Sequence, residues 1–207
     1  AGPRGLRLGD GPGHFPPEAP ILVGPAGSTV LLADVSDDDR PDLFVGSSLA
    51  GSMSVALCRP DGSFEPAISY SLGLTTSTLN SLSFDVRGSG VLAVTAGTVG
   101  VAGGEARIFR SHGDGELGLM GVIAPALPNR VVAGRVGALN ADDAPDLVLQ
   151  LDAGTTSPVL TVTAYIGQPG GTFIPTWSLG DAALGRLGSI DIGTGLDLVT
   201  LGSSGGV

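Results

Sequence analysis

Short apolar segments alternate along the chain with turns rich in glycine, proline and aspartate. In the clearest stretch the apolar segments cover about residues 28–35, 41–49, 51–59 and 64–72. An Asp-Gly pair at Asp61 and Gly62 joins the last two, and Asp-Gly between apolar runs is a strong hairpin signal. No segment of useful length has the i, i+3, i+4, i+7 spacing of a helix. The pattern therefore predicts an all-β protein with almost no helix.

The strand pattern repeats with a period of about 51 residues. The segment "DVSDDDRPDLFVGSS" at 34–48 resembles "ALNADDAPDLVLQLD" at 138–152, and weaker relatives begin at Asp85 and Asp191. Aligning them forms one column of Asp42, Ala93, Asp146 and Asp197. A second column, which follows Gly-rich turns, holds Phe15, Phe64, Leu117 and Phe173. Two columns with one period indicate a true structural repeat.

Several strands, such as "PDLVLQL" and "SVALC", are apolar on successive residues, which predicts sheets covered on both faces. Four-stranded antiparallel sheets packed face to face around an axis meet this requirement, and that architecture is the β-propeller. We predict a single propeller domain, or propeller segment, over residues 1–207. Its repeats are a half blade at 1–24, blades at 25–75, 76–127 and 128–181, and a half blade at 182–207. The terminal halves could form one shared blade and close a four-bladed ring; the alternative is a slice through a larger ring.

The loop "DVSDDDRPD" gathers five aspartates between two predicted strands. Alternate positions offer oxygen atoms: Asp34, Ser36, Asp38, the carbonyl of Arg40, and Asp42. Calcium takes six to eight oxygen ligands, which this set and a water or two would supply. Like charges about 4 Å apart repel by about 1 kcal/mol in water and about 4 kcal/mol near a protein surface, and a divalent ion reverses that term. The loop therefore predicts a Ca²⁺ site.

The intervening aspartates, Asp37 and Asp39, are expected to point to solvent. An EF-hand is excluded, because its sixth and twelfth positions require Gly and Glu where this loop has Asp39 and Val45. Position 6 still needs a residue that tolerates positive φ, and Asp is one of the few besides Gly. The alternative to a calcium site is an Asp-rich turn that bonds to its own backbone.

The segments "DVSDDDRPDLFVG" and "RPDGSFEPAISYSLG" resemble the FG-GAP/VCBS repeat. Members of that family form β-propellers like the integrin α-subunit head, bind calcium between the first two strands of a blade, and are usually extracellular. The resemblance assigns the calcium ligands to Asp34, Ser36, Asp38, Arg40 and Asp42. The fourth repeat keeps a weaker second set, Asn140, Asp142 and Asp146, because Ala138 replaces its first ligand. The other two loops are expected to persist only as turns.

Composition narrows the partner classes. Twenty acidic and ten basic residues give a net charge of −10, and no cluster of Lys and Arg offers a nucleic-acid groove or a patch for an anionic membrane. No apolar run approaches the roughly 20 residues that span a bilayer. The single cysteine, Cys58, is predicted to be a small buried hydrophobe.

Candidates for catalysis are few. No nucleophile–base, zinc or phosphate-loop motif is present, and His112, beside Asp114 and Glu116, is interpreted as part of an exposed hairpin turn. Tyr165 and Trp177 are expected to fill a gap between blades rather than to stack on a sugar. We therefore predict a protein that is not an enzyme.

These inferences lead to an extracellular, calcium-binding module for adhesion or for binding a protein or glycan at a surface. Its calcium is structural, and self-association is expected if the ring is incomplete. One alternative is a lectin or the propeller part of a polysaccharide-active enzyme. Another is a structural segment of a large surface protein or filament.

Overall fold

The computed structural model describes residues 29–47, 51–72, 78–84, 90–97, 104–126, 128–140, 142, 144–153, 159–180, 182–188 and 197–202. Within these ranges every regular element is a β-strand. No helix long and apolar enough to cross a membrane occurs in this part of the chain. The prediction of an all-β protein is confirmed.

The strands form three four-stranded sheets and one two-stranded sheet, all antiparallel. The first sheet contains β1 (Thr29–Ala33), β2 (Asp42–Ser47), β3 (Ser52–Ala56) and β4 (Ile68–Ser71). The second contains β5 (Thr78–Phe84), β6 (Val91–Gly97), β7 (Glu105–Ser111) and β8 (Leu117–Ile123). The third contains β9 (Arg130–Gly137), β10 (Asp146–Asp152), β11 (Leu160–Gly167) and β12 (Phe173–Gly180). The two-stranded sheet pairs β13 (Ala182–Gly188) with β14 (Asp197–Gly202).

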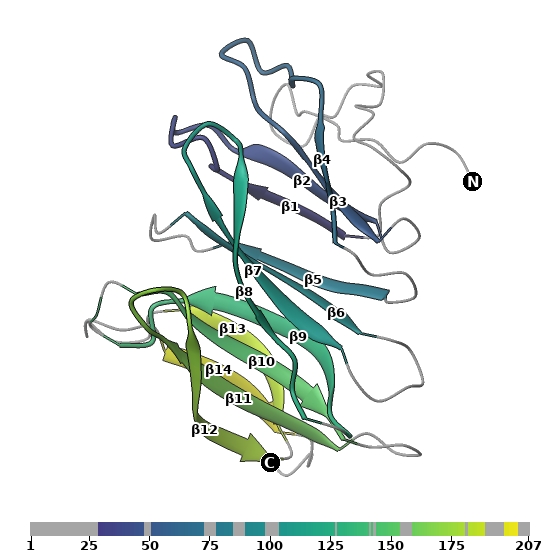
Figure 1. Cartoon of the computed structure of the whole chain (residues 1–207), viewed down its shortest axis with the longest axis vertical. Coiled ribbons are helices and arrows are strands. Elements are labelled where there is room, and N and C mark those ends of the chain that lie inside the picture. Colours follow the sequence, from purple (N-terminus) through teal and green to yellow (C-terminus); the bar gives the residue numbers. More distant parts are fainter. Residues whose placement is uncertain are drawn as a thin grey trace.

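Consecutive sheets contact each other through their first strands, β1 with β5, β5 with β9 and β9 with β13. The contacts between later sheets also include β6 with β9 and β11 with β13. In Figure 1 the first, second and third sheets follow one another down the long axis, with β13 and β14 beside the third. Among the described strands, no pairing joins the first sheet to the two-stranded sheet. The proposed partner of that half, residues 1–24, lies outside the described residues, as do Phe15 and the loop at Asp191.

Two apolar clusters hold the sheets together. The first joins the first and second sheets through buried side chains, which are Val35, Phe44, Met53, Val55, Leu72, Phe109 and Leu117. The second joins the second and third sheets; it consists of Ala106, Ile108, Val131, Val136, Leu147, Leu149, Leu151 and Tyr165. Neighbouring residues of β7 thus serve different clusters, Ile108 the second and Phe109 the first. The middle sheet is therefore covered on both faces, as the continuous apolar runs predicted.

The start of each second strand corrects part of the sequence alignment. Asp42, Asp146 and Asp197 are the first residues of β2, β10 and β14. In the second sheet, however, β6 opens at Val91, and Ala93 is its third residue. The column of four therefore holds for the three aspartates and is wrong for Ala93.

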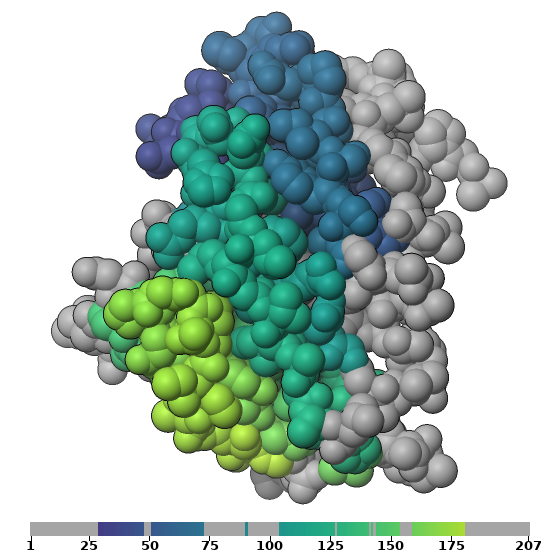
Figure 2. Space-filling view, viewed as in Figure 1, coloured from purple at the N-terminus to yellow at the C-terminus, as the bar shows by residue number. Residues whose placement is uncertain are grey.

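The fourth strand of the third sheet is the most exposed of the strands whose side chains are described. From Ile174 to Gly180 every residue of β12 is exposed, and β11 and β12 stand out in yellow-green in Figure 2. Trp177 is 42% exposed, so the expectation that it fills a gap between sheets is wrong. Tyr165 is buried in the second cluster, as expected.

Candidate metal centre

The acidic loop connects β1 to β2 and is closed by the fully buried carboxylate of Asp42. Its Oδ2 accepts hydrogen bonds from the backbone N–H of Val35 at 2.9 Å and of Ser36 at 3.1 Å, and from the Ser36 hydroxyl at 3.1 Å. Its Oδ1 accepts the backbone N–H of Cys58 at 2.8 Å. Asp42 therefore ties the start of the loop to the chain that follows β3.

Asp34 and Asp38 organise the tip of the loop. Asp34 accepts the backbone N–H of Asp38 at 3.1 Å through Oδ1 and that of Asp39 at 2.8 Å through Oδ2. Asp38 accepts the backbone N–H of Arg40 at 2.9 Å, and its other oxygen pairs with the Arg40 guanidinium. The Arg40 Nε in turn donates to the carbonyl of Cys58 at 3.1 Å. Each carboxylate thus satisfies backbone N–H groups of a tight turn.

The two intervening aspartates behave as the sequence predicted. Asp37 and Asp39 are exposed, with φ angles of 59° and 63°. Asp is among the few non-glycine residues that adopt this region readily. The alternation of inward and outward side chains therefore follows from the backbone of the loop itself.

All five predicted calcium ligands lie in this one loop, and their donors are oxygen atoms, as a hard cation requires. An oxygen of a carboxylate has about two acceptor sites, so Oδ2 of Asp42 is already saturated, whereas each oxygen of Asp34 has one site left. In the conformation described, no group of three or more His, Cys, Asp or Glu side chains forms a metal site within the described ranges. The donor chemistry fits calcium, and in this conformation the Arg40 guanidinium pairs with one oxygen of Asp38.

The second predicted set of calcium ligands, in the third sheet, also forms hydrogen bonds within its own loop. The Asn140 side-chain amide donates to Asp142 at 2.8 Å, and Asp142 accepts the backbone N–H of Ala144 at 2.9 Å. Asp146 is fully buried; it accepts the backbone N–H of Leu139 at 2.6 Å. Burial raises the pKa of Asp146 and the nearby charge of Asp142 adds to this, whereas the hydrogen bonds oppose it.

The sequence did not reveal that Asp146 also accepts the backbone N–H of Gly167 at 2.9 Å. Gly167 ends β11 as Cys58 follows β3, so Asp146 and Asp42 bridge the same two parts of their sheets. The available signal was the shared "PDL" at the start of both second strands.

A second buried carboxylate in the third sheet was also missed. Asp152 ends β10 and forms an ion pair with Arg130, whose Nη2 lies 2.5 Å from its Oδ2. Asp152 also accepts the backbone N–H of Val159 at 2.9 Å. The signal was a pair of opposite charges, Arg130 at the start of one strand and Asp152 at the end of the next, which the antiparallel register places opposite each other.

Cys58 and His112 both lie at hairpins between the third and fourth strands of their sheets. Cys58 is half-buried rather than buried, because it lies at the base of the hairpin turn that follows β3. His112 is exposed in the turn between β7 and β8, as expected.

No protein-family model matches the chain, and no curated protein matches it.

Proposed function

We propose that the chain is a calcium-binding propeller segment of FG-GAP/VCBS type that acts outside the cell as a non-catalytic binding or adhesion module. The observation that supports the proposal best is the stacking of three four-stranded antiparallel sheets through their first strands. In a propeller the first strands of successive blades surround the axis. The acidic loop lies between the first two strands of one such sheet, where the resemblance puts the ion.

Calcium in this proposal is structural. Asp34, Asp38 and Asp42 lie within nine residues, together with the exposed Asp37 and Asp39. Their mutual repulsion opposes closure of the loop, and a divalent cation turns that repulsion into attraction. The ion would stiffen the connection between β1 and β2. Extracellular calcium, at about millimolar levels, keeps even a modest site occupied.

Calorimetric titration of calcium into metal-depleted protein tests the proposal. We expect saturable binding and a higher melting temperature. Asp38→Asn removes a proposed ligand and should weaken binding, whereas Asp37→Asn makes the same charge change at an exposed position and should have little effect. Absence of both heat and thermal stabilisation would refute the calcium site.

A second candidate, carbohydrate binding, is favoured by Trp177. Its indole is 42% exposed on β12, next to Leu179, which is 47% exposed. Exposed aromatic rings supply flat apolar surfaces on which the apolar face of a sugar ring can stack. A glycan array probed with the wild-type protein and with Trp177→Ala tests this candidate. Binding that depends on Trp177 supports a lectin, and an array without signal argues against it.

A further inference from the structure

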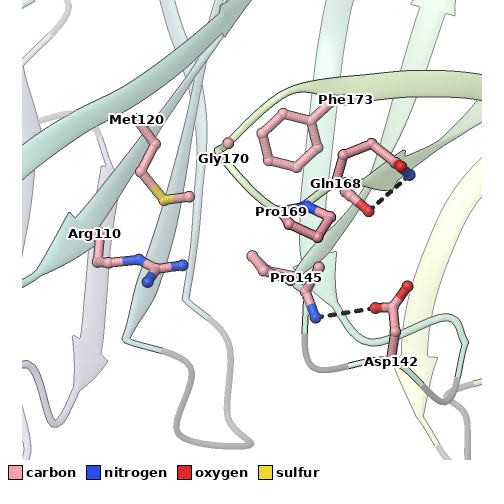
Figure 3. A pocket seen from close by; sticks show the side chains of 11 residues that line it. Arg110, Met120, Asp142, Pro145, Gln168, Pro169, Gly170 and Phe173 are labelled. Atoms are coloured by element: carbon pink, nitrogen blue, oxygen red, sulfur yellow. Dashed lines mark hydrogen bonds between the residues drawn. The ribbon is translucent and has the colours of Figure 1, made fainter.

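A pocket of about 410 Å³ opens between the second and third sheets. Figure 3 shows the Arg110 guanidinium and the Met120 thioether on one side of it, facing Pro145, Pro169 and Phe173 on the other. Arg110 comes from β7 and Met120 from β8. In the third sheet, Pro145 directly precedes β10, Pro169 lies in the turn between β11 and β12, and Phe173 begins β12. Sites for small molecules usually have about this volume and a similar mixture of apolar walls and a few polar groups.

The interface between the first and second sheets can be compared with the one that holds the pocket. The base of the third-to-fourth-strand hairpin is Cys58 with Phe64 in the first sheet and Ser111 with Leu117 in the second. Leu57 and Arg110 therefore occupy equivalent positions, one residue before the base.

The hairpin of the third sheet has its base at Gly167 and Phe173, so Gly171 is the counterpart of Gly115 in the second sheet. A Cβ added at Gly115 would lie 2.8 Å from the Leu57 side chain, so leucine fills the first interface at this point. In the second interface the equivalent residue is Arg110, which is exposed, and a pocket remains.

The Arg110 guanidinium has no partner among the described residues, and this determines the chemistry of the ligand. Arg110 makes no hydrogen bond or ion pair with another described residue. A guanidinium binds a carboxylate through two parallel hydrogen bonds, and the apolar walls accept a hydrocarbon body. Asp142 also lines the pocket, and its charge disfavours a second negative group on the ligand. We propose that this pocket binds a small monocarboxylate with an apolar body, its carboxylate on Arg110 and its body between Met120 and Phe173.

The test uses 3-phenylpropionate as the probe and its uncharged amide as the matched control, with binding followed by NMR titration of the whole chain. We expect the carboxylate to bind at least about tenfold more tightly than the amide, because hydrogen bonds between two charged groups are stronger than those to a neutral group. The dicarboxylate phenylsuccinate should bind more weakly than 3-phenylpropionate.

Arg110→Leu installs the residue that the repeat has at Leu57 and should abolish binding of the probe. Arg59→Leu removes an exposed arginine far from the pocket and should leave binding unchanged. Should Arg110→Leu fold poorly, Arg110→Gln keeps a polar side chain, and its affinity for the probe must still fall about tenfold. Equal binding of acid and amide, undiminished binding to these variants, or no binding of the probe would overturn the proposal. Asp142, a member of the weaker second calcium set, lines the pocket, so chelation alone does not separate the two proposals. Asp38→Asn does, because it changes only the first loop, none of whose five ligands lines the pocket, and it should leave binding of the probe unchanged.

Discussion

Asp42 and Asp146 occupy the same position in two sheets, and each carboxylate bridges the same two pieces of backbone. One oxygen accepts an N–H just beyond the first strand, and the other accepts an N–H at or just beyond the end of the third strand. Both side chains are fully buried. The aspartate of the "PDL" motif therefore closes the sheet whether or not the loop beside it holds a metal.

Replacing Asp42 by Asn should destabilise the protein by about 2–4 kcal/mol, because an amide group cannot accept on both sides. The N–H groups of Val35 or Cys58 would then lack a buried acceptor. Urea denaturation in the presence of a chelator measures this free energy of unfolding without a contribution from calcium. Asp37→Asn, an exposed change of the same kind, should alter it by less than about 0.5 kcal/mol. Equal effects of the two variants would contradict the bridging role.

Much of the fold could be predicted because the local signals agree with one another. The segments at 41–49 and 51–59 contain β2 (Asp42–Ser47) and β3 (Ser52–Ala56). The segment at 64–72 was placed too early, since β4 begins at Ile68. Pro66 has no N–H to donate, so after the Cys58–Phe64 bridge the ladder resumes only beyond it.

What escaped prediction depends on contacts between sheets, which the strand pattern does not encode. The apolar character of Trp177 predicted burial, yet the residue is exposed on β12. The strand pattern also does not show that Arg110 stands where Leu57 fills the equivalent interface between the first two sheets. The spacing of the loop predicted a set of calcium ligands, but the hydrogen bonds of these carboxylates to backbone N–H groups and the ion pair with Arg40 could be seen only in the structure.

Gly167 offers a sharper packing test in the third sheet. A Cβ at this position would lie 2.1 Å from the backbone carbonyl oxygen of Pro145, which cannot move without disturbing the Asp146 bridge. Gly167→Ala should therefore cost about 3 kcal/mol or more. Gly180→Ala, on β12 of the same sheet, meets nothing within 4 Å and should be neutral or slightly stabilising. Chemical denaturation of both variants measures these free energies. A mild effect of Gly167→Ala would contradict the close approach of residue 167 to the Pro145 carbonyl oxygen.

The raised pKa of Asp146 predicts a specific dependence of stability on pH. Burial makes the folded protein hold this proton more tightly than the unfolded chain, whose Asp has a pKa of about 3.9. The corresponding stability is fully present below about pH 3.9 and is lost as the pH rises through the folded pKa. Asp146→Asn should remove this part of the pH dependence of the free energy of unfolding, even though it also lowers stability at every pH. Parallel curves for wild type and variant between pH 3.5 and about 6 would show that Asp146 has an ordinary pKa.

The Arg40 side chain should compete with calcium, although its backbone carbonyl is a proposed ligand. The guanidinium pairs with Asp38 and bonds to the carbonyl of Cys58, so an incoming cation must displace it. Exposed ion pairs contribute about 0.2–1 kcal/mol, and removing the positive charge also lowers repulsion of Ca²⁺. Arg40→Gln keeps the carbonyl and should tighten calcium binding by about two- to fivefold in calorimetric titration. Arg59→Gln, which alters an exposed arginine in the neighbouring turn, controls for net charge. Weaker binding to Arg40→Gln than to Arg59→Gln would show that the guanidinium supports the loop rather than competing for it.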